Sequence, residues 1–459
     1  MGGGGREHAI GSALSRSEAP LFVAAPQVNP GLKALASDYL VVPVEDRTRI
    51  ARWAQERSIE LAVLGPEAAI AAGVADELRA AKVPTVGPSA AAGRIETSKS
   101  FAREIMERHH IPGRPRFRTV ASASAAREAI QAMEGPFVVK ASGLAQGKGV
   151  WVQGSDFESA EEGAALIEKL FPPTGKERSV VVEERLEGEE FSLLAFVDGS
   201  SVHPMPLVQD YKRALEGNRG PNTGGMGSYS ERDHLLPFVT RSDHESAVEI
   251  MRGVVSALRA EQMEYRGILY GGFMLTAQGP QVLEFNARFG DPEALNVLTL
   301  FDGTDFADLL FQVAAGRIDA SHVSFRRRAT VCKYVVPKGY PADPMKGAKL
   351  HLDRRAIQDL GVTVYFGSVT AGPQRNTVLT GTSRAVALVG EASARKEAEA
   401  RVEQALTHIE GTFDVRHDVG TAADVNARVE HMKHILGTAP FDPVKNPTRS
   451  GPSPPPIFT

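Results

Sequence analysis

The chain has 459 residues, 42% of them apolar and 24% charged, which is ordinary for a globular protein and leaves room for about three domains. Its formal net charge of −4 at pH 7 gives no reason to expect a nucleic acid or an acidic membrane surface as a partner. A single cysteine, Cys332, excludes an intramolecular disulfide, and we find neither a signal-peptide core nor an apolar stretch long enough to span a bilayer. The composition therefore predicts a cytoplasmic protein.

Residues 1–97 alternate short apolar runs, which predict buried strands, with helical patterns. The strands are expected at 21–25, 39–44 and 61–65, and the helices at 45–58 and 67–81. This order predicts a parallel sheet with helices on its faces, hence an α/β domain. Ligands of such sheets bind at the carboxyl ends of the strands, which here lead into the turns Asn29 to Gly31 and Gly65 to Glu67.

The glycine run at residues 2–5 has the composition of a turn that follows a first strand, yet no strand precedes it. Neighbouring strands would then carry unpaired backbone groups, each costing about 1–3 kcal/mol when buried. We therefore expect that the first strand is missing, and that the natural protein carries several more apolar residues before Gly2.

The rest of the chain mixes helices and strands before a polar end. We expect, in order, a helix at 98–109 with Thr97 as its N-cap, a strand ending at Lys140, a strand at 150–152, a helix at 156–170, strands at 179–184 and 190–198, a helix at 240–260, a hairpin of strands 268–276 and 281–286, and a helix near 392–409 among short strands. Residues 203–230 are expected to be irregular because they are rich in Gly, Pro and Asn. The proline-rich end at 437–459 is predicted to be disordered.

A glycine-rich loop follows the strand that ends at Lys140. It contains Gly143, Gly147, Lys148 and Gly149. Glycines let backbone N–H groups approach a phosphate closely, and lysines supply positive charge. The loop is not a Walker A motif, because Gly149 takes the place of the required Ser or Thr. A glycine-rich hairpin without a ligand is the alternative interpretation.

The strand at 281–286 predicts a metal site. Side chains alternate along a strand, so Glu284, Asn286 and Arg288 are expected on one face. A carboxylate and an amide oxygen suit a hard cation shared with phosphates. Arg288 could clamp a carboxylate or a γ-phosphate. The alternative is an ordinary half-buried strand whose polar face is in water.

Two further signals lie between these motifs. An apolar strand leads into the acids Glu183, Glu184 and Glu190, which could accept hydrogen bonds from an adenine amine or ribose hydroxyls, although acidic strand ends are usually solvated. Segment 209–213 and the glycine-rich segment 220–227 predict a shaped loop, and ordered loops of this length are often functional.

Segments 4–9, 220–227 and 286–293 together resemble the ATP-grasp superfamily and, within it, the phosphoribosylamine–glycine ligase family. The implied parts are an N-terminal parallel α/β domain of the pre-ATP-grasp type at 1–97, a central ATP-grasp domain at 98–322 with a mobile lid at about 115–190, and a small C-terminal α+β domain at 323–436. One departure is Ser142, where the family's loop usually has Asp; this bears on the energetics of the loop more than on the reaction.

The resemblance also implies a reaction of purine biosynthesis. ATP would phosphorylate the carboxylate of glycine, and the amine of 5-phosphoribosylamine would attack the resulting glycyl phosphate, giving glycinamide ribonucleotide, ADP and phosphate. Mg²⁺ or Mn²⁺ is the implied cofactor. Such a reaction asks the protein mainly for positioning and charge stabilisation.

Residue roles follow from the same resemblance, motif by motif. The implied metal ligands are Glu284 and Asn286, and the implied catalytic residues are Arg288 and Asp210. The implied ATP-binding residues are Lys99, Lys140, Gly143, Gly147, Lys148, Glu183, Glu184, Leu186 and Glu190. The implied substrate-binding residues are Arg6, Asn29, Gly31, Glu67, Asn222, Thr223, Gly224 and Gly225.

Two alternatives stay open from the sequence. One is another ATP-grasp carboxylate–amine ligase with a different acid or amine, and the phosphoribosylamine motifs argue against it. The other is a catalytically inactive nucleotide-binding paralogue, and the retained lysines and metal-site residues argue against that. The expected partners are small molecules (ATP, glycine and 5-phosphoribosylamine), and the chain is expected to be a monomer or a homodimer.

Overall fold

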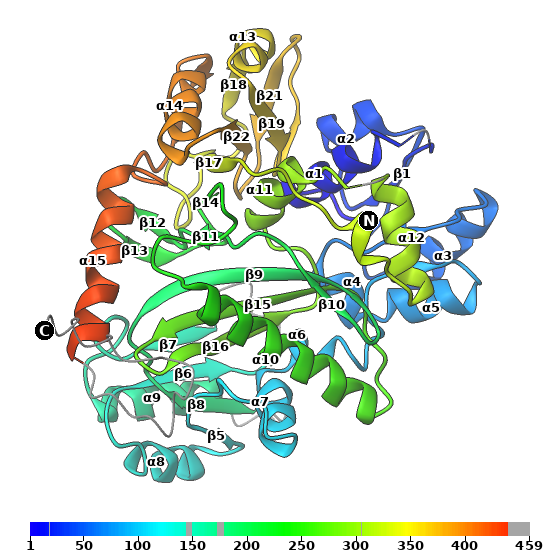
Figure 1. Cartoon of the computed structure of the whole chain (residues 1–459). Helices are drawn as coiled ribbons and strands as arrows, with labels where there is room; N and C mark the ends of the chain where they lie inside the picture. Colours follow the sequence, from blue (N-terminus) through cyan, green and yellow to red (C-terminus); the bar gives the residue numbers. More distant parts are fainter. Residues whose placement is uncertain (18, 144–148, 172–178, 304, 439–459) are drawn as a thin grey trace, which may run out of the picture.

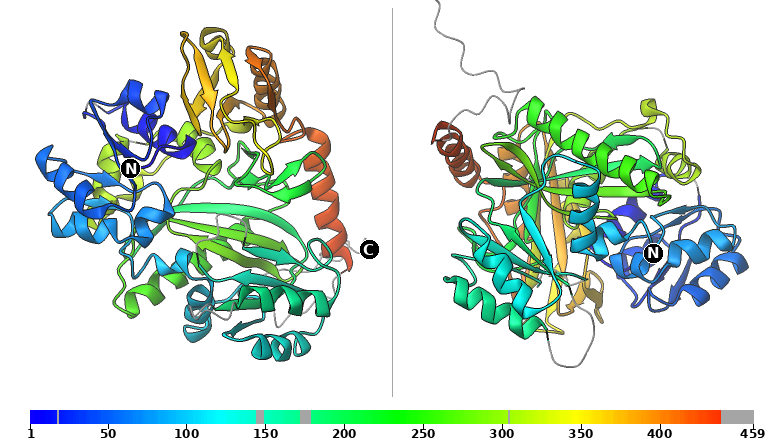
Figure 2. Two further views of the ribbon diagram at one scale, coloured as in Figure 1. Left: turned by 180° about the vertical axis from the view of Figure 1, so that it is seen from behind. Right: turned by 90° about the horizontal axis from the view of Figure 1, so that it is seen from below.

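The computed structural model describes residues 1–17, 19–143, 149–171, 179–303 and 305–438 (Figure 1). Helices and strands of the N-terminal region lie to one side, a small sheet and its helices lie at the base, and the C-terminal strands stand at the top (Figures 1 and 2). A wide antiparallel sheet runs between them. None of the described helices is long and apolar enough to cross a membrane.

The N-terminal region alternates helices and parallel strands, as predicted. Its elements are α1 (Gly5–Leu14), β1 (Phe22–Ala25), α2 (Pro30–Leu35), β2 (Asp38–Val41), α3 (Arg47–Glu56), β3 (Ala62–Val63), α4 (Glu67–Ala71), α5 (Val74–Ala80), β4 (Thr85–Val86) and α6 (Arg94–Thr97). The single helix predicted at 67–81 is two helices, because Gly73 adopts a left-handed φ of 75° between them.

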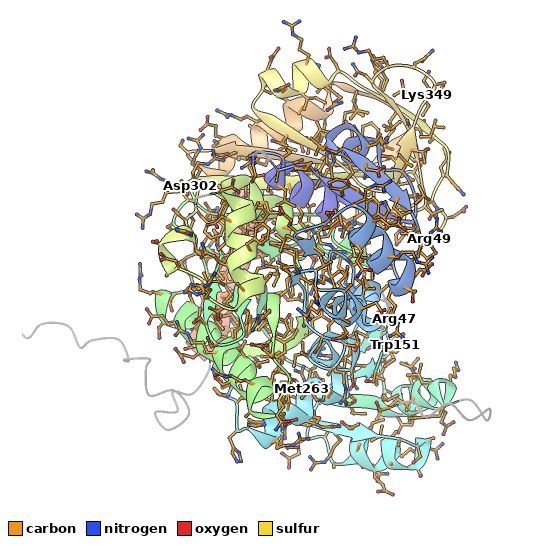
Figure 3. All side chains as sticks on the ribbon, turned by 90° about the vertical axis from the view of Figure 1, so that its right-hand side faces the viewer. Arg47, Arg49, Trp151, Met263, Asp302 and Lys349 are labelled. Carbon is orange, nitrogen blue, oxygen red and sulfur yellow. The ribbon has the colours of Figure 1, made fainter. Side chains whose placement is uncertain are left out.

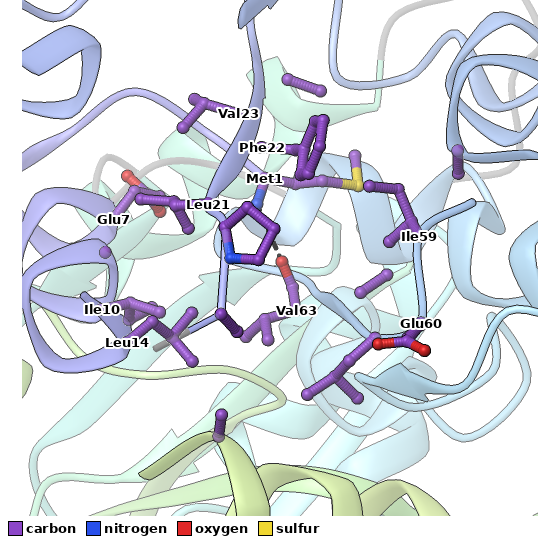
Figure 4. Close-up of a pocket in the computed structure, with 18 of the residues that line it drawn as sticks. Met1, Glu7, Ile10, Leu14, Leu21, Phe22, Val23, Ile59, Glu60 and Val63 are labelled. Atoms are coloured by element: carbon purple, nitrogen blue, oxygen red, sulfur yellow. Dashed lines mark hydrogen bonds between the residues drawn. The ribbon is translucent and has the colours of Figure 1, made fainter. Parts of the chain in front are cut away.

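The N-terminal strands form two separate parallel pairs, β1–β2 and β3–β4. The chain start lies between these pairs: the Gly2 amide donates to the Ala24 carbonyl at 2.9 Å, and the Met1 ammonium donates to the Val63 carbonyl at 2.8 Å (Figure 4). A cavity of about 200 Å³ opens beside these contacts, and most of its lining is apolar. The N-terminal sheet is therefore divided at this place.

The small sheet has strand order β5–β8–β6–β7 and a core of its own. Its elements, with the helix that precedes them, are α7 (Lys99–Arg108), β5 (Phe117–Val120), α8 (Ala123–Gln131), β6 (Phe137–Ala141), β7 (Val150–Val152), α9 (Ala160–Leu170) and β8 (Val180–Glu184). The predicted cap of α7 was wrong by one residue: Ser98, not Thr97, is the N-cap, because its hydroxyl accepts from the Phe101 amide at 3.3 Å.

The central sheet has strand order β10–β9–β15–β16, and every pairing in it is antiparallel. It consists of β9 (Glu189–Asp198), β10 (Val202–Pro204), β15 (Arg266–Thr276) and β16 (Gly279–Asn286). Helix α10 (Arg241–Ala260) packs on it and buries the apolar stripe that predicted the helix. In the predicted hairpin of β15 and β16, Gly272 lies directly opposite Glu284.

A six-stranded sheet joins the central and C-terminal parts of the chain. Its strands are β11 (Gln209–Asp210), β14 (Gly227–Ser230), β17 (Ala329–Pro337), β19 (Val362–Phe366), β22 (Val386–Ala392) and β24 (Phe413–Asp414). The prediction that residues 203–230 are irregular was wrong in part, because β11, β12 (Arg213–Leu215), β13 (Arg219–Asn222) and β14 pair their backbone groups there despite the glycines. The sheet thus contains strands from both sides of residue 322.

The remaining elements surround these sheets. They are α11 (Glu293–Leu300), α12 (Phe306–Ala315), η1 (Ala320–His322), β18 (Lys349–Leu352), α13 (Arg354–Asp359), β20 (Val369–Ala371), β21 (Thr377–Thr380), α14 (Arg395–Leu406), β23 (Ile409–Gly411) and α15 (Ala422–Thr438). Lys349 of β18 and Trp151 of the small sheet lie far apart along the molecule (Figure 3). Helix α15 includes residues 437–438 of the predicted tail, and residues 439–459 lie outside the described ranges.

Candidate active site

A polar cavity of about 130 Å³ lies between β16 and the small sheet. Elements far apart in the sequence line it: the N-terminal region, α7, β6, β8 and β16. The predicted site residues that line it are Glu67, Lys99, Lys140, Gly143, Glu183, Glu284, Asn286 and Arg288. The cavity also contains two charged residues that the sequence did not suggest, Glu96 and Arg103.

Glu284 is surrounded by positive charge. Burial opposes its ionisation, but the ammonium groups of Lys212, Lys99 and Lys140 lower the pKa of the Glu284 carboxyl below its usual value. The opposing residue, Gly272, has no side chain, and a Cβ there would come within 3.5 Å of Glu284 Cγ. Glu284 is therefore an ionised carboxylate with space on its strand face.

Asn286 lies two residues further along β16, so its side chain leaves the strand on the same face as that of Glu284. Its amide nitrogen donates to the Phe285 carbonyl at 2.9 Å, which leaves the amide oxygen as an acceptor. Among the described residues no group of three or more His, Cys, Asp or Glu side chains could hold a metal ion. One carboxylate and one amide oxygen fit Mg²⁺ or Mn²⁺ only where phosphates and water complete the shell.

Arg288 is held by two acids. Its guanidinium lies 3.0 Å from Glu96 Oε1 and 3.6 Å from Glu67 Oε2, and the other Glu96 oxygen accepts from the Ala287 amide at 2.7 Å. Burial raises the pKa of the Glu96 carboxyl, whereas the charges of Arg288 and Arg6 overcome burial at Glu67 and lower its pKa. Glu96 thus fixes both the backbone and the side chain of the turn that carries Arg288.

Lys140 and Glu183 belong to a buried ionic cluster with Arg103. The Arg103 guanidinium bonds both Glu183 oxygens at 2.7 and 3.0 Å, and Lys140 Nζ lies 2.7 Å from Glu183 Oε2. Against the effect of burial, these two cations lower the pKa of Glu183 to about 2. Arg103 and Lys140 also donate to the Leu283 carbonyl, next to Glu284. Both oxygens of the Glu183 carboxylate therefore bind protein cations, so neither is free of partners to accept a hydrogen bond from adenine.

Asp210 and Glu190 lie around Lys212, outside the lining of the polar cavity. Lys212 Nζ is 2.7 Å from Glu190 Oε2, and the electrostatic effect of Lys212 reaches Glu284. Asp210 Oδ1 is buried and has no hydrogen-bond partner among the described residues. Burial, together with the nearby Glu293 carboxylate, raises the pKa of Asp210 well above its usual value.

The predicted substrate residues of the N-terminal region are engaged with the protein. Arg6 Nε lies 2.7 Å from Glu7 Oε1, and Arg6 donates to the Phe289 carbonyl at 3.1 Å. The Asn29 side chain caps α2 and donates to the Gly3 and Phe366 carbonyls at 2.9 and 2.7 Å. A Cβ at Gly31 would come within 2.0 Å of the His8 ring, so the turn needs glycine for packing.

The remaining predicted residues lie at the borders of this region. Glu184 accepts from the Arg116 amide and its guanidinium, both at 2.8 Å, and Leu186 is half-buried in the connection to β9. Asn222 ends β13, and Thr223 to Gly225 connect it to β14. Gly147 and Lys148 lie outside the described residues.

Sequence reasoning missed three charged residues of this region, namely Glu96, Arg103 and Lys212. Nothing in the local pattern distinguishes Glu96 or Arg103 from a solvated helix residue. Lys212 lies two residues after Asp210, within the loop predicted at 209–213, so the sequence offered a signal for it.

Models of known families match most of the chain. The N domain, the ATP-grasp (A) domain and the C domain of phosphoribosylglycinamide synthetase match residues 1–96, 97–294 and 330–422. The phosphoribosylamine–glycine ligase of Thermococcus gammatolerans is 44% identical over 437 residues, which cover 95% of this chain and 97% of that protein.

Solved structures agree with this result. The phosphoribosylamine–glycine ligase of Thermotoga maritima superposes with a TM-score of 0.76 at 28% identity, over 91% of this chain and 98% of that one. The biotin carboxylase domain of 2-oxoglutarate carboxylase from Hydrogenobacter thermophilus, solved with MgADP, shares the fold with a TM-score of 0.68 at 14% identity, over 94% of this chain and 92% of that one. The chain therefore belongs to the phosphoribosylamine–glycine ligase family of ATP-dependent, ATP-grasp ligases.

Proposed function

We propose that this chain joins glycine to 5-phosphoribosylamine at the expense of ATP, through a glycyl phosphate, and that the polar cavity between β16 and the small sheet is where ATP reacts. The observation that carries the proposal is that Lys99 and Lys140 line the same cavity as Glu284. On the same strand face, the Asn286 amide oxygen is left as an acceptor among the described residues. Positive groups and a hard-cation site next to each other suit the charge of a triphosphate.

The proposed reaction has two steps. A carboxylate oxygen of glycine attacks the γ-phosphorus of ATP, and the bond to the bridging oxygen breaks to release ADP. The amine nitrogen of phosphoribosylamine then attacks the carbonyl carbon, the carbon–oxygen bond to phosphate breaks, and the nitrogen loses a proton. Little covalent chemistry falls to the protein, so orientation and charge stabilisation dominate.

Mg²⁺ or Mn²⁺ is part of the proposal. Glu284 and Asn286 would hold it together with phosphate oxygens, and when bound it would neutralise charge that develops on the phosphates. Lys99 and Lys140 reach the same cavity and would bind phosphate oxygens directly. The Arg103–Glu183 pair would keep Lys140 aimed at them.

The other ligand contacts remain proposals of the same kind. Gly143 would approach the phosphates, as would Gly147 and Lys148, and the hinge residues Glu184, Leu186 and Glu190 would face adenosine. Arg6 and Glu67 would contact phosphoribosylamine, next to the turn that Asn29 and Gly31 shape. The proposal places a monomeric or homodimeric enzyme in the cytoplasm.

Isotope transfer tests the proposal. The enzyme is incubated with ATP, Mg²⁺, freshly made phosphoribosylamine and glycine labelled with ¹⁸O in its carboxyl group. Label should appear in the released phosphate, because a carboxylate oxygen leaves with it. ADP formation with unlabelled phosphate would exclude the acyl phosphate, and no ADP formation with any acid and amine offered would indicate an inactive paralogue. ADP formation that requires a different acid or amine would identify another ligase.

A further inference from the structure

Arg384 extends from the connection between β21 and β22, in the C-terminal part of the chain, to the loop between β13 and β14. We propose that Arg384 is a positioning residue for the binding of glycine: it holds the Gly224–Gly225 backbone against Asp210. The proposal rests on the proposed function, because that function makes glycine the amino acid that binds there.

The Arg384 guanidinium binds three segments at once. It donates to the carbonyls of Gly224, Gly225 (3.0 Å) and Asp291 (2.8 Å), and it lies 3.2 Å from Asp291 Oδ2. The Arg384 Cζ atom lies 4.6 Å from the centre of the Tyr334 ring, and the Tyr334 hydroxyl donates to Asp291 Oδ1 at 2.7 Å. A buried guanidinium with this many acceptors fixes their relative positions.

The loop held by Arg384 packs directly on Asp210. Gly225 has a φ of 105°, and a Cβ on it would come within 2.5 Å of both Asp210 Oδ1 and Pro292 Cδ. On the other side, the Thr223 hydroxyl donates to the Lys212 carbonyl at 2.9 Å. The loop therefore touches Asp210 Oδ1, a buried oxygen that lacks a partner among the described residues.

An unpaired, buried oxygen of a carboxyl group is costly unless a ligand supplies a donor, and a cationic donor would favour the ionised form of Asp210. The α-ammonium group of glycine is such a donor. The charge of the neighbouring Lys212 acts on both Asp210 and Glu284, which places this position close to the metal-site strand. If Arg384 were lost, the three carbonyls would lose their shared donor and Gly225 could move away from Asp210. Binding of the amino acid should then weaken, whereas the ATP cavity, which Arg384 does not line, should be unaffected.

Arg395 offers a matched control. Like Arg384 it belongs to the C-terminal part and has a largely buried side chain, 12% exposed against 13%. It forms an ion pair with Glu231 at 2.6 Å and lies over the Tyr229 ring at 5.4 Å. Its loss should therefore cost a similar ion pair and ring contact without releasing the loop at Gly224 and Gly225.

The test compares R384M, R384K and R395M with the unmodified chain by steady-state kinetics. The KM for glycine should rise by about tenfold or more in R384M and less in R384K, because lysine keeps the charge and loses the planar fork. The KM for ATP should stay within about twofold in all variants. R395M should change neither KM. R384K carries the comparison should R384M fail to fold.

Titration calorimetry with glycine, in the presence of Mg²⁺ and a non-hydrolysable ATP analogue, gives a second readout that needs no turnover. Weaker glycine binding in the Arg384 variants, but not in R395M, supports the proposal. Unchanged glycine affinity in R384M, or equal shifts of both KM values in R384M and R395M, would overturn it. An unmodified chain that neither binds nor consumes glycine would instead refute the proposed function.

Discussion

Two cavities of this molecule differ in what lines them. The one beside β1 and β3 is the larger, about 200 Å³, and its walls are mainly apolar side chains such as Phe22, Leu61 and Val63. The one between β16 and the small sheet is about 130 Å³, and acids and bases make up half of its lining residues. By volume alone the apolar cavity would be taken as the functional site, whereas the charged lining indicates that the polar cavity is.

The difference is instructive because burying charge is expensive. Ionised groups persist inside a protein only where partners or ligands compensate them, so a cluster of buried charges in a cavity indicates function more strongly than volume does. An apolar cavity mainly costs packing energy. Substitutions in the polar cavity should therefore change catalysis, and substitutions in the apolar cavity should change stability.

The largest effect is expected for E284Q. The substitution keeps the shape of the side chain and removes the charge among the lysines, so kcat should fall by roughly 10²-fold or more. Steady-state ADP release at saturating Mg²⁺ measures this. The matched control is E60Q, since Glu60 is a carboxylate in the lining of the apolar cavity. Normal turnover of E284Q would mean that the polar cavity is not the catalytic centre.

An intermediate effect is expected for E183Q. The pKa of Glu183 is lowered from 4.5 to about 2, so its contribution to stability is complete above pH 4.5 and is lost as the pH falls toward 2. A shift of this size corresponds to about 3 kcal/mol. The acid limb of the unfolding free energy, measured with urea between pH 5 and 2, should flatten in E183Q, and the KM for ATP should rise.

The neighbouring variant E184Q is the control for the acid limb of the unfolding free energy. Glu184 also pairs with an arginine, Arg116, but that pair lies at the surface and should contribute less than about 1 kcal/mol. Equal acid limbs in E183Q and E184Q would show that the buried cluster around Lys140 contributes no more to the unfolding free energy than the surface pair does.

The smallest effect is expected for A307L, which adds three carbons to the wall of the apolar cavity. Filling part of the space should stabilise the fold by about 1 kcal/mol and raise Tm by roughly 2 °C. Both KM values and kcat should stay the same. A kinetic change in A307L would break the contrast between the two cavities, and calorimetric melting curves together with an ADP-release assay would reveal it.

Much of the fold could be read from periodicity. The hairpin of β15 and β16 and the helix α10 stand close to their predicted positions, because long apolar patterns leave few alternatives. The strands β11 to β14 were missed, because Gly, Pro and Asn have a low strand propensity and predict irregular structure. Pairing with strands elsewhere in the fold overrides that local preference. Ser98 replaced Thr97 as a cap because both are good caps and only geometry selects one.

The candidate site was predictable only where one short segment carried it. Alternation along β16 was enough to select Glu284 and Asn286. Arg384 is more than 150 residues away from the loop it binds, and Arg103 reaches Glu183 across 80 residues. Such pairs are set by the fold, so no local pattern can reveal them. Asn29 shows the converse, a polar residue in a promising turn whose side chain is used up by backbone partners.

The pairing of β14 with β17 limits where this chain can be divided into fragments that fold. Ser228 and Cys332 face each other in that pairing, and Ser230 and Thr330 share a hydroxyl–hydroxyl bond of 2.7 Å. A cut near residue 322 would leave two fragments with open, complementary strand edges, each prone to aggregate on its own. The two fragments should recover a folded state only by complementation, when they are produced together and β14 of one can pair with β17 of the other.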